Sequence, residues 1–265
     1  AADTVTLGTL TVNGGAVTIT EADGVEFVGT NNASSLALTT TTGSITDTDA
    51  SLTVTNNASF ASLDDSAITL DGTLSLGSLT FDGGEVTIFE ADGLEVTGVN
   101  EATVLTLVAS GTESTDNIVV DSKITATSAD LYAGGSVTVG CSAELTMTED
   151  IGLWFSTHYD ENGVVSAVYD SGGTISICSS ATISGGFFVA EYGEILIAPD
   201  SKGRLSRVST ERVADYFNAL EPVLEVAGQW DARDAGALQT SIGLGEITLD
   251  TGADVEIEIE EEEEK

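Results

Sequence analysis

The sequence has few of the residues that usually carry enzyme chemistry or bind nucleic acid. Its 265 residues include 7 basic side chains against 44 acidic ones, a single histidine, 2 cysteines and 2 prolines, and aromatic residues make up 6%. The formal net charge of −37 repels phosphate backbones, which excludes nucleic acid as a partner. No run of about 18 apolar residues is present, so we predict no membrane span.

Short β-strands are the structure that the remaining composition favours. Threonine, serine, glycine and valine dominate, and apolar residues occupy alternate positions, as at Leu10 and Val12 or at Val17 and Ile19. Alternation of this kind turns one face of a strand inward. Glycine, asparagine or aspartate interrupts the pattern after about 5 to 8 residues, which is typical of turns. The sequence therefore predicts an all-β protein.

The chain contains an internal repeat, in which Leu76–Gly98 is a second version of Leu7–Gly29. Each strand is too short to bury its own face, so neighbouring strands must stack. We predict a parallel β-solenoid (β-helix) and expect the offset between the copies to comprise three coils of about 23 residues. The alternative is a tandem of two β-sandwiches, each small for a core without cross-links.

Three regions are expected along the chain. Residues 1–200 form the β-solenoid, interrupted near 153–169 by a hairpin insertion with an Asn-Gly turn. Residues 201–236 form a basic linker and an amphipathic helix that serves as a short C-terminal helical cap. Residues 237–265 contain terminal strands and an acidic tail.

The predicted hairpin concentrates aromatic residues in a chain that has few. Trp154 and Tyr159 are candidates for contact with a glycan or a protein partner, and the alternative is a cap that packs through its rings. His158 lies in the same segment. Because no serine or cysteine is arranged with it as a nucleophile, a structural role is expected.

The C-terminal part offers further candidates for partner contacts. Arg204 and Arg207 belong to a basic stretch, and Phe217 lies on the apolar stripe of the expected helix, which either covers the last coil or docks a neighbouring subunit. Val255 and Ile257 alternate with glutamates. Such a strand is either an edge protected by charge or an edge that another chain completes by strand addition.

The motif Glu-Ala-Asp-Gly occurs in both repeat copies. It supplies Glu21 and Asp23 in the first copy and Glu90 and Asp92 in the second. If the copies stack, these carboxylates form a ladder that would suit a hard cation such as Ca²⁺. The alternative is turn chemistry alone, since Asp-Gly is a common turn pair. No other cofactor is expected.

The cysteines Cys141 and Cys178 lie in similar local sequences, Val-Gly-Cys-Ser and Ser-Ile-Cys-Ser. If each occupies the same place on its own coil, the two can form a disulfide, which an extracellular location would permit. The alternative is two small buried residues.

Catalysis is not expected. A solenoid lyase acting on acidic polysaccharides would need a basic side chain close to its acids, and the first 122 residues contain no lysine or arginine. A hydrolase that uses carboxylates alone, such as Asp150 with Asp160, stays open as an alternative. We therefore predict a protein that is not an enzyme.

The segments Ala67–Leu70 and Leu76–Ile88, together with Asn57–Phe60, resemble the repeats of very large secreted bacterial β-strand-repeat proteins, which are similar in style to filamentous-haemagglutinin-like adhesins. The resemblance covers about residues 4 to 140. It implies an extracellular or cell-surface rod of parallel coils that acts as an adhesin or a filament subunit and associates with itself or with neighbouring subunits. A carbohydrate-binding or carbohydrate-cleaving β-helix is the alternative.

Overall fold

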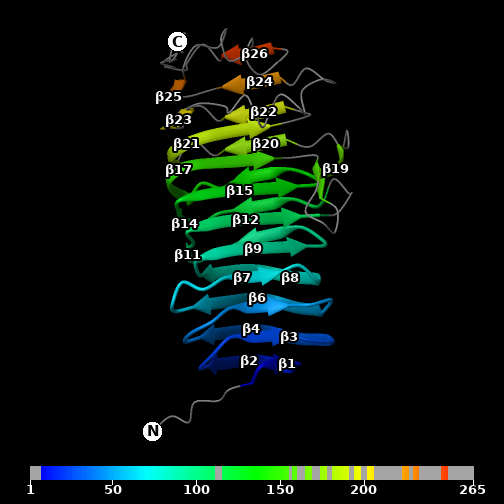
Figure 1. Ribbon diagram of the computed structural model, residues 1–265. Helices are drawn as coiled ribbons and strands as arrows, with labels where there is room; N and C mark the ends of the chain where they lie inside the picture. Colours follow the sequence, from blue (N-terminus) through cyan, green and yellow to red (C-terminus); the bar gives the residue numbers. More distant parts are fainter. Residues whose placement is uncertain are drawn as a thin grey trace, which may run out of the picture.

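The protein is a stack of short strands wound around one axis, as the computed structural model in Figure 1 shows. The structure describes residues 7–110 and 115–154, and beyond them the segments 157–159, 165–168, 174–177, 181–190, 194–197, 202–205, 223–226, 229–232 and 246–249. The N-terminal strands lie at one end of the stack and the last described strands at the other. Among the described residues there is no helix, and hence none long and apolar enough to cross a membrane.

In chain order, the first strands are β1 (Thr9–Leu10), β2 (Asn13–Glu21), β3 (Val25–Phe27), β4 (Thr30–Thr40), β5 (Ile45–Asp47), β6 (Ser51–Ser62), β7 (Ile68–Leu70), β8 (Thr73–Asp82), β9 (Glu85–Glu90), β10 (Leu94–Val96), β11 (Val99–Glu101), β12 (Val104–Ala109) and β13 (Ile118–Val120). They are followed by β14 (Lys123–Ala126), β15 (Ser128–Ala133), β16 (Val137–Val139), β17 (Glu144–Trp154), β18 (Thr157–Tyr159), β19 (Val165–Val168), β20 (Thr174–Ile177), β21 (Thr182–Ala190), β22 (Glu194–Ile197), β23 (Lys202–Leu205), β24 (Val223–Val226), β25 (Gln229–Ala232) and β26 (Glu246–Leu249).

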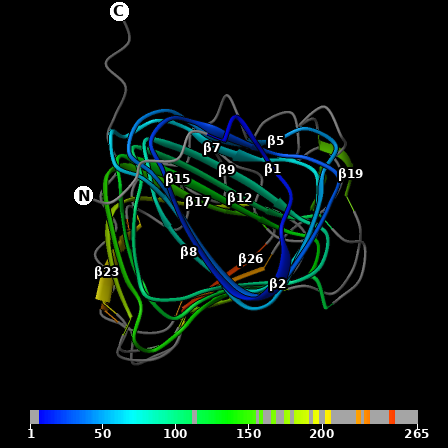
Figure 2. The same ribbon diagram turned by 90° about the horizontal axis from the view of Figure 1, so that it is seen from below.

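Parallel pairing between successive turns joins the described strands, apart from β18 and β19, into one 24-stranded sheet. Viewed along the axis, the coils superimpose in one closed outline (Figure 2). The predicted parallel β-solenoid is therefore confirmed, and the tandem sandwich is excluded. The hairpin insertion is also confirmed, because β18 and β19 pair antiparallel on the side of the stack.

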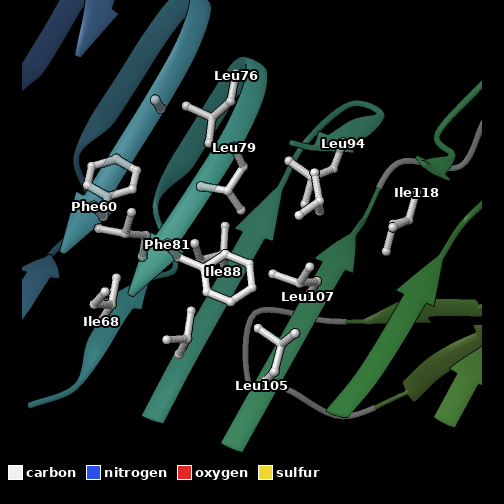
Figure 3. Close-up of a cluster of buried hydrophobic side chains, with 14 of the residues drawn as sticks. Phe60, Ile68, Leu76, Leu79, Phe81, Ile88, Leu94, Leu105, Leu107 and Ile118 are labelled. Carbon is white, nitrogen blue, oxygen red and sulfur yellow. The ribbon is translucent and has the colours of Figure 1, made fainter. Parts of the chain in front are cut away.

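Alternating side chains build the core, as the sequence predicts. In β4, inward and outward residues alternate up to Ala33, the alternation breaks at Ser34 and Ser35, and it resumes at Leu36, where the register to β6 shifts. The strand therefore bends around a corner of the coil. Figure 3 shows the resulting interior, filled by buried side chains from successive strands: Phe60, Ile68, Leu76, Leu79, Phe81, Ile88, Leu94, Leu105, Leu107 and Ile118.

The turns are unequal, and along one inward column they are shorter than the sequence predicts. One inward column, here called the Val17 column, consists of Val17, Leu36, Ala58 and Leu79. Each step along this column takes fewer residues than the expected coil of about 23 residues. Three turns from Val17 therefore end at Leu79, before the chain reaches Val86, which is the repeat equivalent of Val17. The rest of the repeat carries the chain from Leu79 to the next face of the coil.

As a consequence, the second repeat copy is rotated by one face relative to the first. A second inward column, the Val25 column, consists of Val25, Ile45, Ile68 and Val86. Val86 is the repeat equivalent of Val17, yet it lies in the Val25 column. The equivalent of Phe27 is Val96, which lies above Leu79 and so continues the Val17 column.

Some described strands lie in the region for which a basic linker and an amphipathic helix are expected. Parallel pairing continues through β22, β24 and β26 and through β23 and β25, so the solenoid extends beyond residue 200. The expected helix begins at Glu211, which lies outside the described residues. Leu224, which also belongs to the region 201–236, lies in β24. Residues 250–265, which include the acidic tail, are also outside the described part of the chain.

Candidate functional site

The most conspicuous polar groups of the described solenoid are two buried glutamates at equivalent positions of the repeat. Glu21 ends β2, Glu90 ends β9, and both side chains are fully buried. The Oε1 atom of Glu21 accepts a hydrogen bond from the Leu7 amide at 3.0 Å, and that of Glu90 accepts one from the Leu76 amide at 3.0 Å. Neither Oε2 atom has a hydrogen-bond partner. Each glutamate thus fixes the backbone at the start of its own repeat copy.

The predicted ladder of carboxylates does not form. Asp23 and Asp92 are exposed, whereas the glutamates two residues earlier point inward. The one-face rotation also separates the copies, because Glu21 pairs with Thr40 and Glu90 with Ala109. Among the described residues, no three acidic, histidine or cysteine side chains form a group that could hold a metal ion. Calcium binding by these four residues stays an untested prediction.

Burial changes the acidity of two carboxyl groups. Desolvation raises the pKa of Glu90 to about 8, with a smaller contribution from the charge of Asp92, and outweighs the opposing hydrogen bond from Leu76. Desolvation also raises the pKa of Asp47 to about 6, although the amides of Asp71 and Gly72 donate to its carboxylate at 2.7 and 3.2 Å. At neutral pH Glu90 is therefore mainly protonated, which makes its burial tolerable.

Two asparagines, Asn31 and Asn100, are also fully buried, and sequence reasoning missed them. The Oδ1 atom of Asn31 accepts the Val12 amide at 2.7 Å, and that of Asn100 accepts the Phe81 amide at 2.9 Å. Val12 and Phe81 occupy equivalent positions of the two repeat copies, and so do the two asparagines. The available signal was the pattern Gly-x-Asn at both positions.

The amide groups of these asparagines donate to their own turn, just before each asparagine, and to the following turn. Nδ2 of Asn31 donates to the carbonyl oxygens of Val28, Gly29 and Ser51, and Nδ2 of Asn100 donates to the carbonyl oxygens of Thr97 and Lys123 and to Oγ of Ser122. Each asparagine therefore joins three successive turns. The glycines before them, Gly29 and Gly98, adopt positive φ angles of 67° and 78°, which a corner at this point requires.

The described part of the chain brings no acidic and basic pair together in the interior. The one ion pair among the described residues joins Lys123 Nζ to Glu144 Oε2 at 3.9 Å, and both side chains are about half exposed. An exposed pair of this kind contributes little to stability. The buried side chains described above each bind backbone groups of their own solenoid, so they support the winding of the chain; they are Glu21, Asn31, Asp47, Glu90 and Asn100.

Cys141, Trp154 and Tyr159 are candidates that lie among the described residues. Cys141 is disulfide-bonded, and Cys178, the one other cysteine of the sequence, lies outside the described residues, so their pairing stays a prediction. Trp154 ends β17 between Tyr132 and Ala190 of neighbouring turns. Tyr159 lies in β18, opposite Val165.

The remaining partner-contact candidates are divided between one described strand and the undescribed part of the chain. Arg204 lies in β23, opposite Asp231 of β25. The others, Arg207, Phe217, Val255 and Ile257, lie outside the described residues, so their predicted roles are not tested.

The first described turn has a different environment from its equivalent in the second repeat copy. Val17 and Ile19 of β2 are only partly buried, whereas their equivalents Val86 and Ile88 of β9 are fully buried. β9 has β7 on one side and β12 on the other, but β2 pairs with β4 alone among the described strands. This edge of β2, which no other described strand pairs, is called here the open end.

Comparisons with family models, with curated proteins and with solved structures gave no match to this chain.

Proposed function

We propose that the protein is a structural or adhesive β-solenoid module of the extracellular space or the cell surface, without catalytic activity. The observation that carries this proposal is that the buried polar side chains described above form hydrogen bonds within the solenoid. Glu21, Glu90, Asn31, Asn100 and Asp47 all bind backbone atoms of the solenoid itself. These side chains therefore contribute to the shape and rigidity of the solenoid.

The acidic composition supports the same proposal. With a formal net charge of −37, the outer faces repel one another and keep a long rod dispersed. The disulfide at Cys141 agrees with an oxidising location. A stiff shaft with a charged surface is suited to holding other parts at a distance from a cell, or to forming part of a fibre.

Electron microscopy and small-angle X-ray scattering of the purified protein test this proposal. We expect the monomeric protein to be elongated at all salt concentrations, with a long dimension that agrees with the stack of described strands. A compact globular particle would contradict the rod. Assays for polysaccharide cleavage provide a separate check, and we expect no activity above that of a denatured sample.

A second candidate is a carbohydrate-binding β-helix, favoured by the hairpin of β18 and β19 that leaves the stack close to Trp154. A glycan array with wild-type protein, Trp154→Ala and Tyr159→Ala tests it. A specific glycan signal that both variants lose would support this candidate. Val99→Ala is the control, because it removes an apolar side chain that is 61% exposed on another face of the rod.

A further inference from the structure

The first part of β8 is covered on one side by a side chain and not by a strand. Toward the N-terminal end of the stack, β6 pairs with β8 from Thr73 onward. Toward the C-terminal end, the pairs that β8 makes with described strands begin only at Leu79. The rotation of the second repeat copy by one face therefore leaves residues 73–76 without a described strand on that side. There the Leu76 amide donates to Oε1 of Glu90 at 3.0 Å.

The chain around this contact forms a corner, called here the Glu90 corner, which consists of Ser75–Gly77 and Ala91–Gly93. Two long hydrogen bonds join its halves: the amide of Ala91 donates to the carbonyl oxygen of Leu74 at 3.3 Å, and Oγ of Ser75 donates to Oδ2 of Asp92 at 3.5 Å. The outermost residues of the corner are exposed, namely Gly77, Ala91 and Asp92. A surface corner with few and long hydrogen bonds is the kind of segment that opens locally while the core stays folded.

The Glu90 side chain lies directly inside this exposed corner and has no countercharge. It is fully buried, and its Oε2 atom has no hydrogen-bond partner. The acidic groups nearest to it along the chain and on the turn before are Asp92 and Asp71, both exposed, and the charge of Asp92 opposes ionisation of Glu90. β12 contains no charged residue, β8 contains only Asp82 at its far end, and the first 122 residues contain no lysine or arginine. A buried carboxyl in such surroundings is held in its protonated form.

Opening of the corner changes the surroundings of this carboxyl. With residues 75–77 and 91–93 moved apart, water reaches Glu90, and the carboxyl can release its proton to the solvent. Opening and proton release are therefore linked, so a rise in pH favours the open corner.

We propose that the Glu90 corner is a pH-operated latch, in which protonated Glu90 keeps the corner closed and loss of its proton lets the corner open while the turns on either side stay folded. The inference goes beyond the proposed function, because it gives the rod one point at which rigidity depends on pH. Its place is the junction at which the second repeat copy begins.

Amide hydrogen exchange at Leu76, followed by NMR across a range of pH, tests the latch. The measured quantity is the protection factor, which is the exchange rate corrected for its intrinsic dependence on pH. The pKa of Glu90 is about 8 in the closed corner, against an ordinary value of 4.5. Since each opening releases one proton between these values, the protection factor should fall about tenfold per pH unit from pH 5 to 8, and level off above pH 8.

Urea separates opening of the corner from unfolding of the whole chain, which releases the same proton. The reference is the amide of Leu107 in β12, a fully buried residue with a paired strand on each side. We expect the Leu76 amide to exchange faster than the Leu107 amide and to be insensitive to low concentrations of urea. Local opening exposes little surface, whereas the exchange of Leu107 requires extensive unfolding and should accelerate with urea.

Variants identify the carboxyl that is responsible. Glu90→Gln keeps an acceptor for the Leu76 amide but has no proton to lose, so the protection factor of Leu76 should stay constant from pH 5 to 8. Glu85→Gln changes an exposed carboxyl by the same amount and should keep the tenfold slope. Glu90→Met is a second variant without the titrating group, for use if Glu90→Gln lacks the wild-type circular dichroism spectrum.

Three results would each overturn the latch. They are a wild-type protection factor at Leu76 that does not change with pH, equal protection and equal urea dependence at Leu76 and Leu107, and a folded Glu90→Gln variant with the wild-type slope. Elongated particles in the same samples would leave the proposed function intact.

Discussion

The two repeat copies have nearly the same sequence but different neighbours. Leu7–Gly29 forms the first described turn, in which β2 pairs with one described strand, whereas Leu76–Gly98 lies within the stack, with turns above and below. Their internal hydrogen bonds are the same: a buried glutamate accepts the first amide of each copy, and a buried asparagine accepts the amide at the equivalent position of each copy. The local sequence therefore determines the coil, while its position in the stack determines how deeply the coil is buried.

The largest expected effect is on stability and comes from shortening equivalent apolar side chains, one in each copy, in two separate variants. Ile88→Ala removes a fully buried side chain packed between two turns and should destabilise the protein by about 3 to 4 kcal/mol. Ile19→Ala makes the same change at the open end, where the side chain is only partly buried. We expect it to destabilise the protein by about 1 kcal/mol, because less contact is lost. Urea unfolding of monomeric protein, followed by circular dichroism, measures both. Equal losses would contradict the difference in burial between the copies.

The next effect concerns the pH dependence of stability and arises from Glu90. Its pKa is about 8 in the folded chain against an ordinary value of 4.5, so the folded state keeps a proton that the unfolded state releases between these values. Stability therefore falls as pH rises from 5 to 8, by up to about 4 kcal/mol from this group.

Glu90→Gln should remove this contribution and flatten the pH profile of urea unfolding. General repulsion among the acidic groups also grows with pH, so the control is Glu85→Gln, which changes an exposed carboxyl by the same amount. We expect Glu85→Gln to keep the wild-type slope. A Glu90→Gln variant with that same slope would show that this carboxyl is ionised when buried.

The smallest difference between the copies is expected for the asparagines. Asn31→Ala and Asn100→Ala each leave buried backbone groups of neighbouring turns without a partner. We expect each substitution to lower the free energy of unfolding by about 2 to 3 kcal/mol. Both residues are fully buried, so the two losses should agree closely. Thermal unfolding with Asn56→Ala as an exposed control measures them. A loss confined to Asn100→Ala would mean that the first turn is not held in place by Asn31.

The fold could be predicted from the sequence because alternation and duplication survive in the primary structure. Val17 and Ile19, with their counterparts Val86 and Ile88, define an inward face, and the Asn-Gly turn predicts the hairpin of β18 and β19. The rotation of the second copy could not be predicted, because it arises from unequal turns whose lengths differ at their corners. Corner length has no fixed sequence pattern.

The candidate site was less predictable for a related reason. Glu-Ala-Asp-Gly suggests two exposed acids, yet burial of Glu21 and Glu90 depends on amides that lie at the start of each repeat copy, a full strand and turn earlier in the chain. Likewise, Asn31 and Asn100 are polar residues whose partners belong to three successive turns. These hydrogen-bond partners come together only when the turns stack. The composition and the local sequence pattern therefore predict surface positions for side chains that are in fact buried.

Cross-linking of engineered cysteine pairs tests most directly that the solenoid winds with the second copy one face further round. The structure pairs Thr69 with Thr87, and neighbouring strands lie about 4.8 Å apart, within the range that a disulfide spans. Thr69→Cys with Thr87→Cys should therefore form a disulfide on mild oxidation, detected by mass mapping of unreduced peptides. A regular coil of about 23 residues would instead place Thr87 over Asp64. Our account predicts a link in the first pair and none in Asp64→Cys with Thr87→Cys, and the reverse result, or no link in either pair, would contradict it.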